Sequence, residues 1–416
     1  MKQEEVGQGG DVESDQHQPM RIGIDIRKPA AAASGQQRYL WRLGLWLSGQ
    51  GHEVHFLTAL KQPPDLAVPE GIRLHALASL PPRELRNHVA GLDLDVFLAN
   101  PERARRYEGA RVNLLRPGYG TEQGRQNLRS VRNPISRAVR QLARTTPPVR
   151  ADLRRERAFY LQRDPPPEVI ALSRYMVREI RESYAVPDER LHLVYNGVDT
   201  AEFSPERRAR ERAEARRQWD IPEDALCLLF VGHNYRRKGL WELMEAAARI
   251  ADRGVELRVL TAGRGIGSQL KEALRRARRL GREELFLFPG DIRPSTTAYT
   301  VADAFVFPTW HDAGANVVLE ALASGLPVVT TNVSGSGELI EEGRSGFVIE
   351  PGDVSALTDR LTRLLDPERR GTMGGEARRL AEAHSQEANF AALEDVFRIA
   401  ADRLRGAGPG PRVAAS

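Results

Sequence analysis

The segment PTWHDAGANVVLEALASGLPVVTT (308–331) contains, in order, the end of a strand, a turn, a helix and the next strand. Pro308 and Thr309 end the first strand, and Gly325-Leu326-Pro327 returns the chain at once to the second. Two strands joined through a helix in this way lie parallel in one sheet. The segment therefore predicts an α/β protein.

The same alternation runs through the chain twice. Strands are predicted in the first half at 21–26, 53–59, 72–77, 95–100, 112–115 and 168–173, with a helix at about 37–47. In the second half we predict strands at 226–232, 255–263, 285–290, 304–308 and 326–331, and helices at 239–252, 267–280, 316–324, 354–366 and 372–384. The pattern predicts two open, mostly parallel, doubly wound sheets whose strands direct their carboxyl ends at a shared cleft, where ligands of such sheets bind.

The length of 416 residues also favours two domains, because a single core of that size is unusual. We expect a disordered leader, two Rossmann-like domains, a final helix and a disordered tail, at 1–19, 20–205, 206–384, 385–405 and 406–416.

Several classes of protein are disfavoured by composition. No apolar run approaches the length of about 18 residues that a transmembrane helix needs, and the acidic first 20 residues do not resemble a secretory signal. A single cysteine, Cys227, excludes an intramolecular disulfide and a zinc cluster, which favours a reducing cytoplasm. We expect Cys227 to pack in a core strand rather than act as a nucleophile.

The positive charge of the chain is concentrated in one segment. The net charge is +5, and residues 125–157 hold ten Arg against two acidic residues, which leaves −3 for the rest. This local basicity does not indicate a nucleic-acid-binding protein. Apolar residues recur at helical spacing among these arginines, so the segment is either a solvated helix of the N-terminal domain or a contact with an anionic membrane surface.

The turn at 312–316 has the composition of an anion site. Asp312, Gly314 and Asn316 lead into the helix, whose first backbone N–H groups offer a seat for a phosphate. Gly314 has no side chain to block that approach, and Glu320, one turn beyond Asn316 on the same face, can accept two ribose hydroxyls. The alternative is a glycine-capped core helix with a solvated glutamate.

A second segment, LFVGHNYRRKGLWELMEAA (229–247), places cations after another strand. The strand ends at Gly232, and Lys238-Gly239 opens an amphipathic helix. Cations at this edge suit a diphosphate. Simple solvation of Arg236, Arg237 and Lys238 is the alternative, but Lys occurs at only five positions in a chain with 56 Arg, which favours the functional interpretation.

Together these segments resemble a family-4 retaining glycosyltransferase of the GT-B fold, and within that family the lipopolysaccharide core glucosyltransferases. The resemblance runs from about 20 to 405. It rests on IGIDIR (22–27) with SGQQRYL (34–40), VYNGVDTAEFSP (194–205), FVGHNYRRKGL (230–240), the carboxylate pair that ends at Glu320, and SGSGELIEEGRSGFVIEPGD (334–353).

The resemblance implies a role for each matched residue. Lys238, with Arg237, would neutralise the leaving nucleoside diphosphate, Glu320 would hold the ribose, and Asp312 would orient the donor sugar. The remaining donor contacts that it implies are Gly35, His233, Arg264, Ile292, Ala313, Gly314, Ala315 and Asn316. The apolar stripe of the final helix would pack back on the N-terminal domain.

Three positions depart from the family pattern. Asp312 stands where the family has Glu, which shortens its reach. His233 stands where Arg is common, so Arg236 or Arg237 must supply the second charge. Relatives often carry a His in the acceptor loop, whereas this chain reads RPGYGTE (116–122), so we assign Tyr119 and Glu122 to acceptor binding. These departures leave the choice of substrate open.

No metal site is predicted. Asp93-Leu94-Asp95 resembles the metal-binding Asp-x-Asp of another glycosyltransferase fold but precedes its strand, which indicates a solvated strand entry. The ring pair nearest in sequence, His52 and His55, faces opposite sides of a strand, and we find no ligand spacing at His88, His192 or His384.

We therefore expect a cytoplasmic, metal-independent, retaining hexosyltransferase without a cofactor. Its donor would be a nucleotide sugar and its acceptor a glycan, a glycolipid or a lipopolysaccharide-type molecule; a contact with the inner face of the membrane is an open alternative. The rival interpretations are an epimerase, a phosphorylase, or a degenerate binding subunit of the same fold. The sequence leaves the donor, the acceptor and the oligomeric state open.

Overall fold

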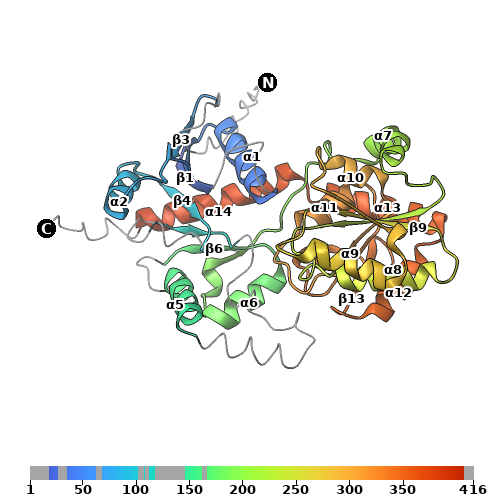
Figure 1. Cartoon of the computed structure of the whole chain (residues 1–416). Coiled ribbons are helices and arrows are strands. Elements are labelled where there is room, and N and C mark those ends of the chain that lie inside the picture. Colours follow the sequence, from blue (N-terminus) through green and yellow to red (C-terminus); the bar gives the residue numbers. More distant parts are fainter. Residues whose placement is uncertain are drawn as a thin grey trace, which may run out of the picture.

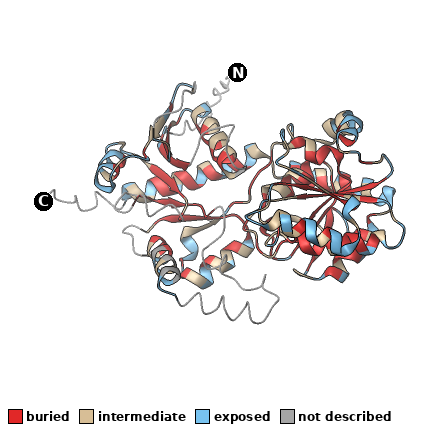
Figure 2. Cartoon of the chain, viewed as in Figure 1, coloured by how far each residue is buried: buried red, intermediate tan, exposed pale blue. Residues whose placement is uncertain are grey.

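The computed structural model describes residues 18–26, 35–61, 68–101, 107, 112–117, 146–161 and 166–406. These residues form two lobes, each built around one sheet, and the chain passes from the first lobe to the second at 194–204 (Figure 1). The strands form the interior of both lobes, while the outer faces of the helices are exposed (Figure 2).

The first sheet is entirely parallel and has the order β3-β2-β1-β4-β5-β6-β7 among the described residues. Its strands are β1 (Arg21–Ile26), β2 (Glu53–Thr58), β3 (Ile72–Ala76), β4 (Val96–Ala99), β5 (Leu114–Leu115), β6 (Glu168–Ala171) and β7 (Leu191–Leu193). The described helices of this part of the chain are α1 (Gly35–Gly49), α2 (Pro82–Ala90), α5 (Pro147–Leu161) and α6 (Arg174–Tyr184), with the 3-10 turn η4 (Asp188–Arg190).

The second sheet repeats the same topology in the order β10-β9-β8-β11-β12-β13. Its strands are β8 (Leu226–Val231), β9 (Leu257–Ala262), β10 (Phe286–Gly290), β11 (Ala304–Phe307), β12 (Val328–Thr331) and β13 (Gly346–Ile349). The helices are α7 (Pro205–Gln218), α8 (Leu240–Ala251), α9 (Gln269–Leu280), α10 (Thr296–Val301), α11 (Asn316–Ala323), α12 (Val354–Arg363), α13 (Pro367–Glu382) and α14 (Gln386–Gly406), with η5 (Glu283–Leu285) and η6 (Gly335–Leu339).

Successive side chains of β8 point to opposite faces of the second sheet, and both faces are covered by helices. Leu228 and Phe230 pack with α8 and α12, whereas Cys227 and Leu229 pack with α11 and α13. Cys227 is fully buried, and burial raises the pKa of its thiol to about 12, so it packs in the core as expected. The predicted fold class, two doubly wound parallel α/β domains, is confirmed.

The final helix, α14, lies in the N-terminal lobe although it follows the C-terminal lobe in sequence (Figure 1). Its apolar stripe joins the N-terminal core through Phe390, Leu393, Val396, Phe397 and Ala400. Arg403 pairs with Glu168 at 2.7 Å, which ties the helix to the first residue of β6. Residues 1–17 and 407–416, which hold most of the predicted leader and tail, lie outside the described residues.

The boundaries of several elements differ from the prediction. Two short strands, β7 and β13, were not expected, because three or four residues show no detectable periodicity. The helix expected from 372 begins at Pro367, since the side chain of Asp366 caps it and proline suits its first turn. The same signals, Ser204 followed by Pro205, begin α7.

The Asp93-Leu94-Asp95 entry is more than a solvated strand start. Asp95 accepts from the backbone N–H of Arg21 at 2.9 Å and pairs with Arg405 at 3.0 Å. It therefore ties β1 and the end of α14 to the entry of β4.

Within the described residues, none of the helices combines the length and apolar composition required to cross a bilayer.

Three histidines that are separate in sequence meet at the outer edge of the first sheet. His55 Nδ1 lies 3.0 Å from His75 Nε2, and His75 Nδ1 lies 3.0 Å from His88 Nε2. Sequence spacing gave no partner for His88, because β3 brings His75 between the other two. Burial, together with the charges of His55 and His88, lowers the pKa of His75 to about 4.

His75 makes the stability of the fold depend on pH. Its pKa is about 4 in the folded state and about 6.5 in an unfolded chain, so unfolding takes up a proton between these values. Its contribution to stability is complete above about pH 6.5 and is lost as the pH falls toward 4. We predict that His75→Gln flattens the decrease in melting temperature across this window. His233→Gln, at an exposed ring, serves as the control; an equally steep decrease in the His75 variant would contradict the assignment.

Candidate functional site

A cavity of about 320 Å³ lies between the lobes, at the carboxyl ends of β8 and β11. These two strands flank the topological switch point of the second sheet, where doubly wound sheets bind ligands. The residues lining the cavity that come from the C-terminal lobe include Gly232, His233, Arg237, Lys238, Asp312, Ala313, Gly314, Ala315 and Asn316. The N-terminal lobe and the junction contribute Gln36, Tyr39, Arg116, Leu172 and Asn196.

Gly239 brings the basic loop after β8 close to the end of β11. It has φ of +82°, and a Cβ there would lie 2.0 Å from the carbonyl oxygen of Pro308. A side chain at this position would therefore be excluded by strain and by contact. The loop is further tied to this strand end by Trp310, whose N–H donates to the carbonyl of Arg237 at 2.8 Å.

Lys238 forms an ion pair with Asp312 inside the cavity. The two side chains are 12% and 15% exposed, and the ammonium lies 5.0 Å from the centre of the Phe307 ring. Burial acts to raise the pKa of Asp312, but the charge and hydrogen bond of Lys238, together with the charge of Arg237, outweigh burial and lower that pKa. Burial lowers the pKa of Lys238, and Asp312 opposes that effect. In this state Asp312 is the counterion that a phosphate would have to replace or share.

The turn that follows β11 leaves the start of α11 open to the cavity. Asp312 Oδ1 accepts from the N–H of Gly314 at 3.0 Å, which closes a tight turn. The N-cap residue, Ala315, supplies no side-chain cap, so the first N–H groups of α11 have no side-chain acceptor from that residue. Since Ala315 and Asn316 line the cavity, the geometry suits an anion held at the helix N-terminus.

Gly314 is required by the N-terminal lobe as well. A Cβ at this position would lie 2.9 Å from the Cβ of Leu172. Asn196 donates to the carbonyl of Gly314 at 3.0 Å and to Oδ1 of Asn316 at 2.6 Å, and Ser173 donates to the carbonyl of Ala313 at 2.8 Å. The sequence predicts that this glycine gives a phosphate access to the helix. In the structure the glycine also allows the two lobes to approach closely at Leu172.

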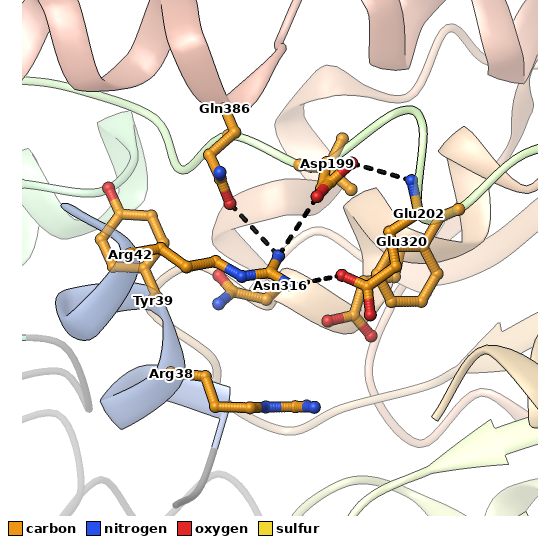
Figure 3. A pocket seen from close by; sticks show the side chains of 11 residues that line it. Arg38, Tyr39, Arg42, Asp199, Glu202, Asn316, Glu320 and Gln386 are labelled. Carbon is orange, nitrogen blue, oxygen red and sulfur yellow. Dashed lines mark hydrogen bonds and ion pairs between the residues drawn. The ribbon is translucent and has the colours of Figure 1, made fainter. Parts of the chain in front are cut away.

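Glu320 lies in a second, smaller cavity of about 40 Å³ (Figure 3). It does not line the larger cavity. Its Oε2 accepts from the hydroxyl of Tyr299 at 2.5 Å. Burial raises its pKa, while the Tyr299 hydrogen bond and the charge of Arg38 oppose that rise in part. Asn316 lines both cavities, so Glu320 is one helical turn away from the cavity that holds Lys238 and Asp312.

The other predicted site residues are distributed as follows. Arg264 and Ile292 line neither cavity; Arg264 pairs at 2.7 Å with Asp291, which precedes Ile292. His233 lines the larger cavity, and its ring accepts from the N–H of Arg264 at 3.4 Å. Gly35 is the first residue of α1, next to the cavity residue Gln36. Tyr119 and Glu122 lie outside the described residues.

Two arginines of the basic loop have different environments. Arg237 lines the cavity, whereas Arg236 is 53% exposed and pairs with Glu272 at 3.1 Å. Of the two arginines that sequence reasoning left open as the second cation, the structure therefore places Arg237 beside Lys238.

Sequence reasoning missed Arg116, Asn196 and Glu338. Arg116 was part of the quoted RPGYGTE motif and Asn196 of VYNGVDTAEFSP, but neither was given a role. Glu338 accepts from the N–H groups of Arg174 and Tyr175 at 2.8 and 2.5 Å. A side-chain carboxylate of the C-terminal lobe therefore caps the start of α6 in the N-terminal lobe. The family motifs marked these positions, but only the packing of the lobes shows what they contact.

Comparison with known families covers both lobes. Residues 33–202 match the family described as Glycosyltransferase Family 4, and residues 225–367 match Glycosyl transferases group 1. The chain belongs to the family-4 glycosyltransferases of the GT-B fold. A curated relative, a D-inositol 3-phosphate glycosyltransferase of Corynebacterium urealyticum, is 33% identical over 232 residues, which are 53% of this chain and 54% of that protein. The chain thus spans about half the length of the curated relatives it matches first.

Solved structures share the fold of this chain. A sucrose-phosphate synthase from Thermosynechococcus elongatus has a TM-score of 0.74 at 22% identity, with 94% of this chain and 100% of that chain covered. WaaG, a glycosyltransferase involved in lipopolysaccharide biosynthesis, has 0.71 at 20% identity, with 92% and 100% covered. HepE of Anabaena, in complex with UDP-glucose, has 0.67 at 17% identity, with 93% and 100% covered. At these identities the likeness concerns the fold.

Lys238 is predicted to act mainly during sugar transfer. In the role that the resemblance implies, Lys238 would interact more strongly with the diphosphate as it departs, so Lys238→Ala should lower turnover by about 100-fold or more. Arg236→Ala removes the same charge from the same loop outside the cavity and should stay within about threefold of wild type. The measurement is initial-rate turnover with one working donor. Equal losses in the two variants would mean that any positive charge in this loop supports turnover, and would contradict a specific role for Lys238.

Glu320 is predicted to act mainly in nucleotide binding. Hydrogen bonds to a charged group are worth about 1.5–3 kcal/mol, so Glu320→Ala should weaken nucleoside diphosphate binding by about 10- to 100-fold, measured by calorimetry. Glu202→Ala is the control, because Glu202 lines the same small cavity and pairs with Arg42 at 2.5 Å. If Glu320→Ala lowered the melting temperature but left nucleotide affinity unchanged, Glu320 would be a residue of the domain junction instead.

Proposed function

We propose that this protein is a retaining hexosyltransferase that transfers a sugar from a nucleotide-sugar donor to a glycan, glycolipid or lipopolysaccharide-type acceptor. The observation that carries the proposal is the composition of the larger cavity. Three cationic side chains, Arg116, Arg237 and Lys238, and one carboxylate, Asp312, line it beside the open start of α11. A cavity with this excess of positive charge suits a nucleoside diphosphate.

The proposed chemistry needs no metal ion. Lys238, Arg237 and the N-terminus of α11 stabilise the charge that develops on the departing diphosphate. Retention follows from attack on the face that the diphosphate leaves, as the family chemistry implies. Asp312 orients the donor sugar once a phosphate has taken over part of its contact with Lys238.

Neighbouring proteins support the donor class more than the acceptor. HepE binds UDP-glucose, and WaaG acts in lipopolysaccharide biosynthesis, as their names state. The curated relatives are named for D-inositol 3-phosphate, but identity of 33% over half of the chain does not carry that acceptor over. We therefore propose the broader acceptor class given above, and a cytoplasmic location.

The proposed membrane contact rests on the sequence. The basic segment 125–157 lies largely outside the described residues, which resume at 146 with α5. Its ten arginines remain the reason to propose attachment to an anionic surface at the inner face of the membrane.

A donor screen tests the proposed function. UDP-, GDP- and ADP-sugars are added to the purified protein, and the melting temperature and slow hydrolysis without acceptor are measured. A donor at 100-fold excess over its Kd should stabilise the fold by about 2.7 kcal/mol. A degenerate binding subunit would be stabilised without hydrolysis, and an epimerase would convert the sugar instead of releasing it. No stabilisation by any nucleotide sugar would refute the proposal.

Asp312 gives the sharpest test of the proposed donor-sugar contact. Asp312→Asn keeps the shape but removes the charge, and charge-assisted hydrogen bonds are about twice as strong as neutral ones. We predict a loss of about 10- to 100-fold in kcat/KM. Affinity for the free nucleoside diphosphate should be unchanged or higher, because Lys238 loses the carboxylate that competes with phosphate. Asp312→Glu, the family's residue, should stay within about tenfold of wild type, and an inert Asp312→Asn would exclude the role.

A further inference from the structure

Arg116 is a buried cation at the ligand edge of the N-terminal sheet. It follows β5 directly, and its N–H donates to the carbonyl of Ala99 at 3.0 Å, which extends the pairing of β4 with β5. The residue is 4% exposed, yet it lines the larger cavity. Its guanidinium is therefore shielded from bulk solvent and borders the space between the lobes.

The contacts of Arg116 do not neutralise it. Its Nη2 donates to Oδ1 of Asn196 at 2.5 Å, and the guanidinium carbon lies 4.5 Å from the centre of the Tyr39 ring. Its Nε is buried without a hydrogen-bond partner. Among the described residues, no carboxylate pairs with it. Burial lowers the pKa of this guanidinium, and Tyr39 opposes that effect in part.

A buried charge that lacks a counterion is costly unless a ligand supplies one. The other buried arginine among the described residues is compensated. Arg216, 3% exposed, pairs with Asp303 at 3.3 Å and donates to three backbone carbonyls. The contrast with Arg216 indicates that Arg116 is adapted to an anion that enters the cavity.

The donor diphosphate is the less suitable anion. The C-terminal lobe already provides Lys238, Arg237 and the start of α11 on its own wall. Arg116 lies on the opposite wall, in the lobe to which the proposed function assigns the acceptor. The guanidinium fork also fits an oxyanion through two parallel hydrogen bonds, and Nε is free to make one of them.

We propose that Arg116 binds an oxyanion group of the acceptor, a phosphate or a carboxylate, and thereby selects acceptors that carry a negative charge close to the hydroxyl that is glycosylated. The inference rests on the proposed function for the identity of the second substrate. Asn196 holds the guanidinium and also donates to Gly314 in the opposite lobe. An anion on Arg116 would therefore lie beside the turn that precedes α11.

Calorimetric binding to simple probes tests the proposal. UDP, or whichever nucleoside diphosphate the donor screen selects, is titrated first into wild type, Arg116→Gln, Arg116→Lys and the control Arg73→Gln. Arg73 belongs to the same lobe, and its side chain is 67% exposed, away from the cavity. Glucose 6-phosphate, glucuronate and glucose are then titrated with and without the nucleotide.

Wild type and Arg73→Gln should bind at least one anionic probe about tenfold or more tightly than glucose. The two anionic probes show whether the site takes phosphate or carboxylate. Arg116→Gln should lose this preference while nucleotide affinity stays within about threefold, and Arg116→Lys, which keeps the charge without the fork, should retain part of it. A purely structural role would not change the preference for anions over glucose. If Arg116→Gln fails to fold, the comparison of wild type with Arg116→Lys decides.

Three results would overturn the proposal: no anion preference in wild type, a preference that persists in Arg116→Gln, or a loss of nucleotide affinity in Arg116→Gln comparable to its loss of anion binding. The last result would assign Arg116 to the donor diphosphate. The proposed function fails separately if wild type binds no nucleotide, and the titrations without nucleotide still report on Arg116 in that case.

Discussion

The approach of Gly314 to Leu172 sets the distance between the two lobes beside the larger cavity. A Cβ on residue 314 would lie 2.9 Å from that of Leu172, closer than real side chains pack, so the turn after β11 can meet the end of β6 only with glycine. Asn196 and Ser173 hold the same turn through its carbonyl oxygens. Because this turn also begins α11, the contact between the lobes fixes where the open helix N-terminus lies.

The electrostatics of the cavity follow from that geometry. Cations reach it from both lobes, and Asp312 is the one acidic side chain among the described residues that line it. Lys238 and Asp312 compensate one another while the cavity is without an anion. Arg237 and Arg116 are not compensated in this way, and both have a buried Nε without a partner. The site is therefore prepared for negatively charged ligands by an excess of desolvated positive charge.

The smaller cavity connects the site to the junction between the lobes (Figure 3). Arg42 of α1 pairs with Glu202 at 2.5 Å and Asp199 at 3.5 Å in the junction, and it donates to Gln386 of α14 at 3.4 Å. One side chain thus links the N-terminal lobe, the connecting segment and the returning helix. Glu320 lines the same cavity, so a nucleotide that engaged it would lie close to the segment that connects the lobes.

The sequence by itself determined the two parallel sheets and the positions of the strand-end motifs. Apolar runs such as β8, glycine at 239 and the turn at 312–316 are local signals, because strand periodicity and turn conformation depend on adjacent residues. It therefore located Lys238 and Asp312 at neighbouring strand ends, although their direct pairing was not predicted.

Tertiary structure alone decided which of these residues share a cavity and what each one contacts. The orientation of Glu320 toward the junction, the compensation of Asp95 by Arg405 and the meeting of His55, His75 and His88 depend on packing between separate elements. Arg116 and Asn196 are 80 residues apart, and nothing in either local pattern indicates their contact. Burial and charge compensation depend on side chains that are distant in sequence, because those side chains exclude water from a group or pair with its charge. A local sequence pattern therefore cannot predict either one.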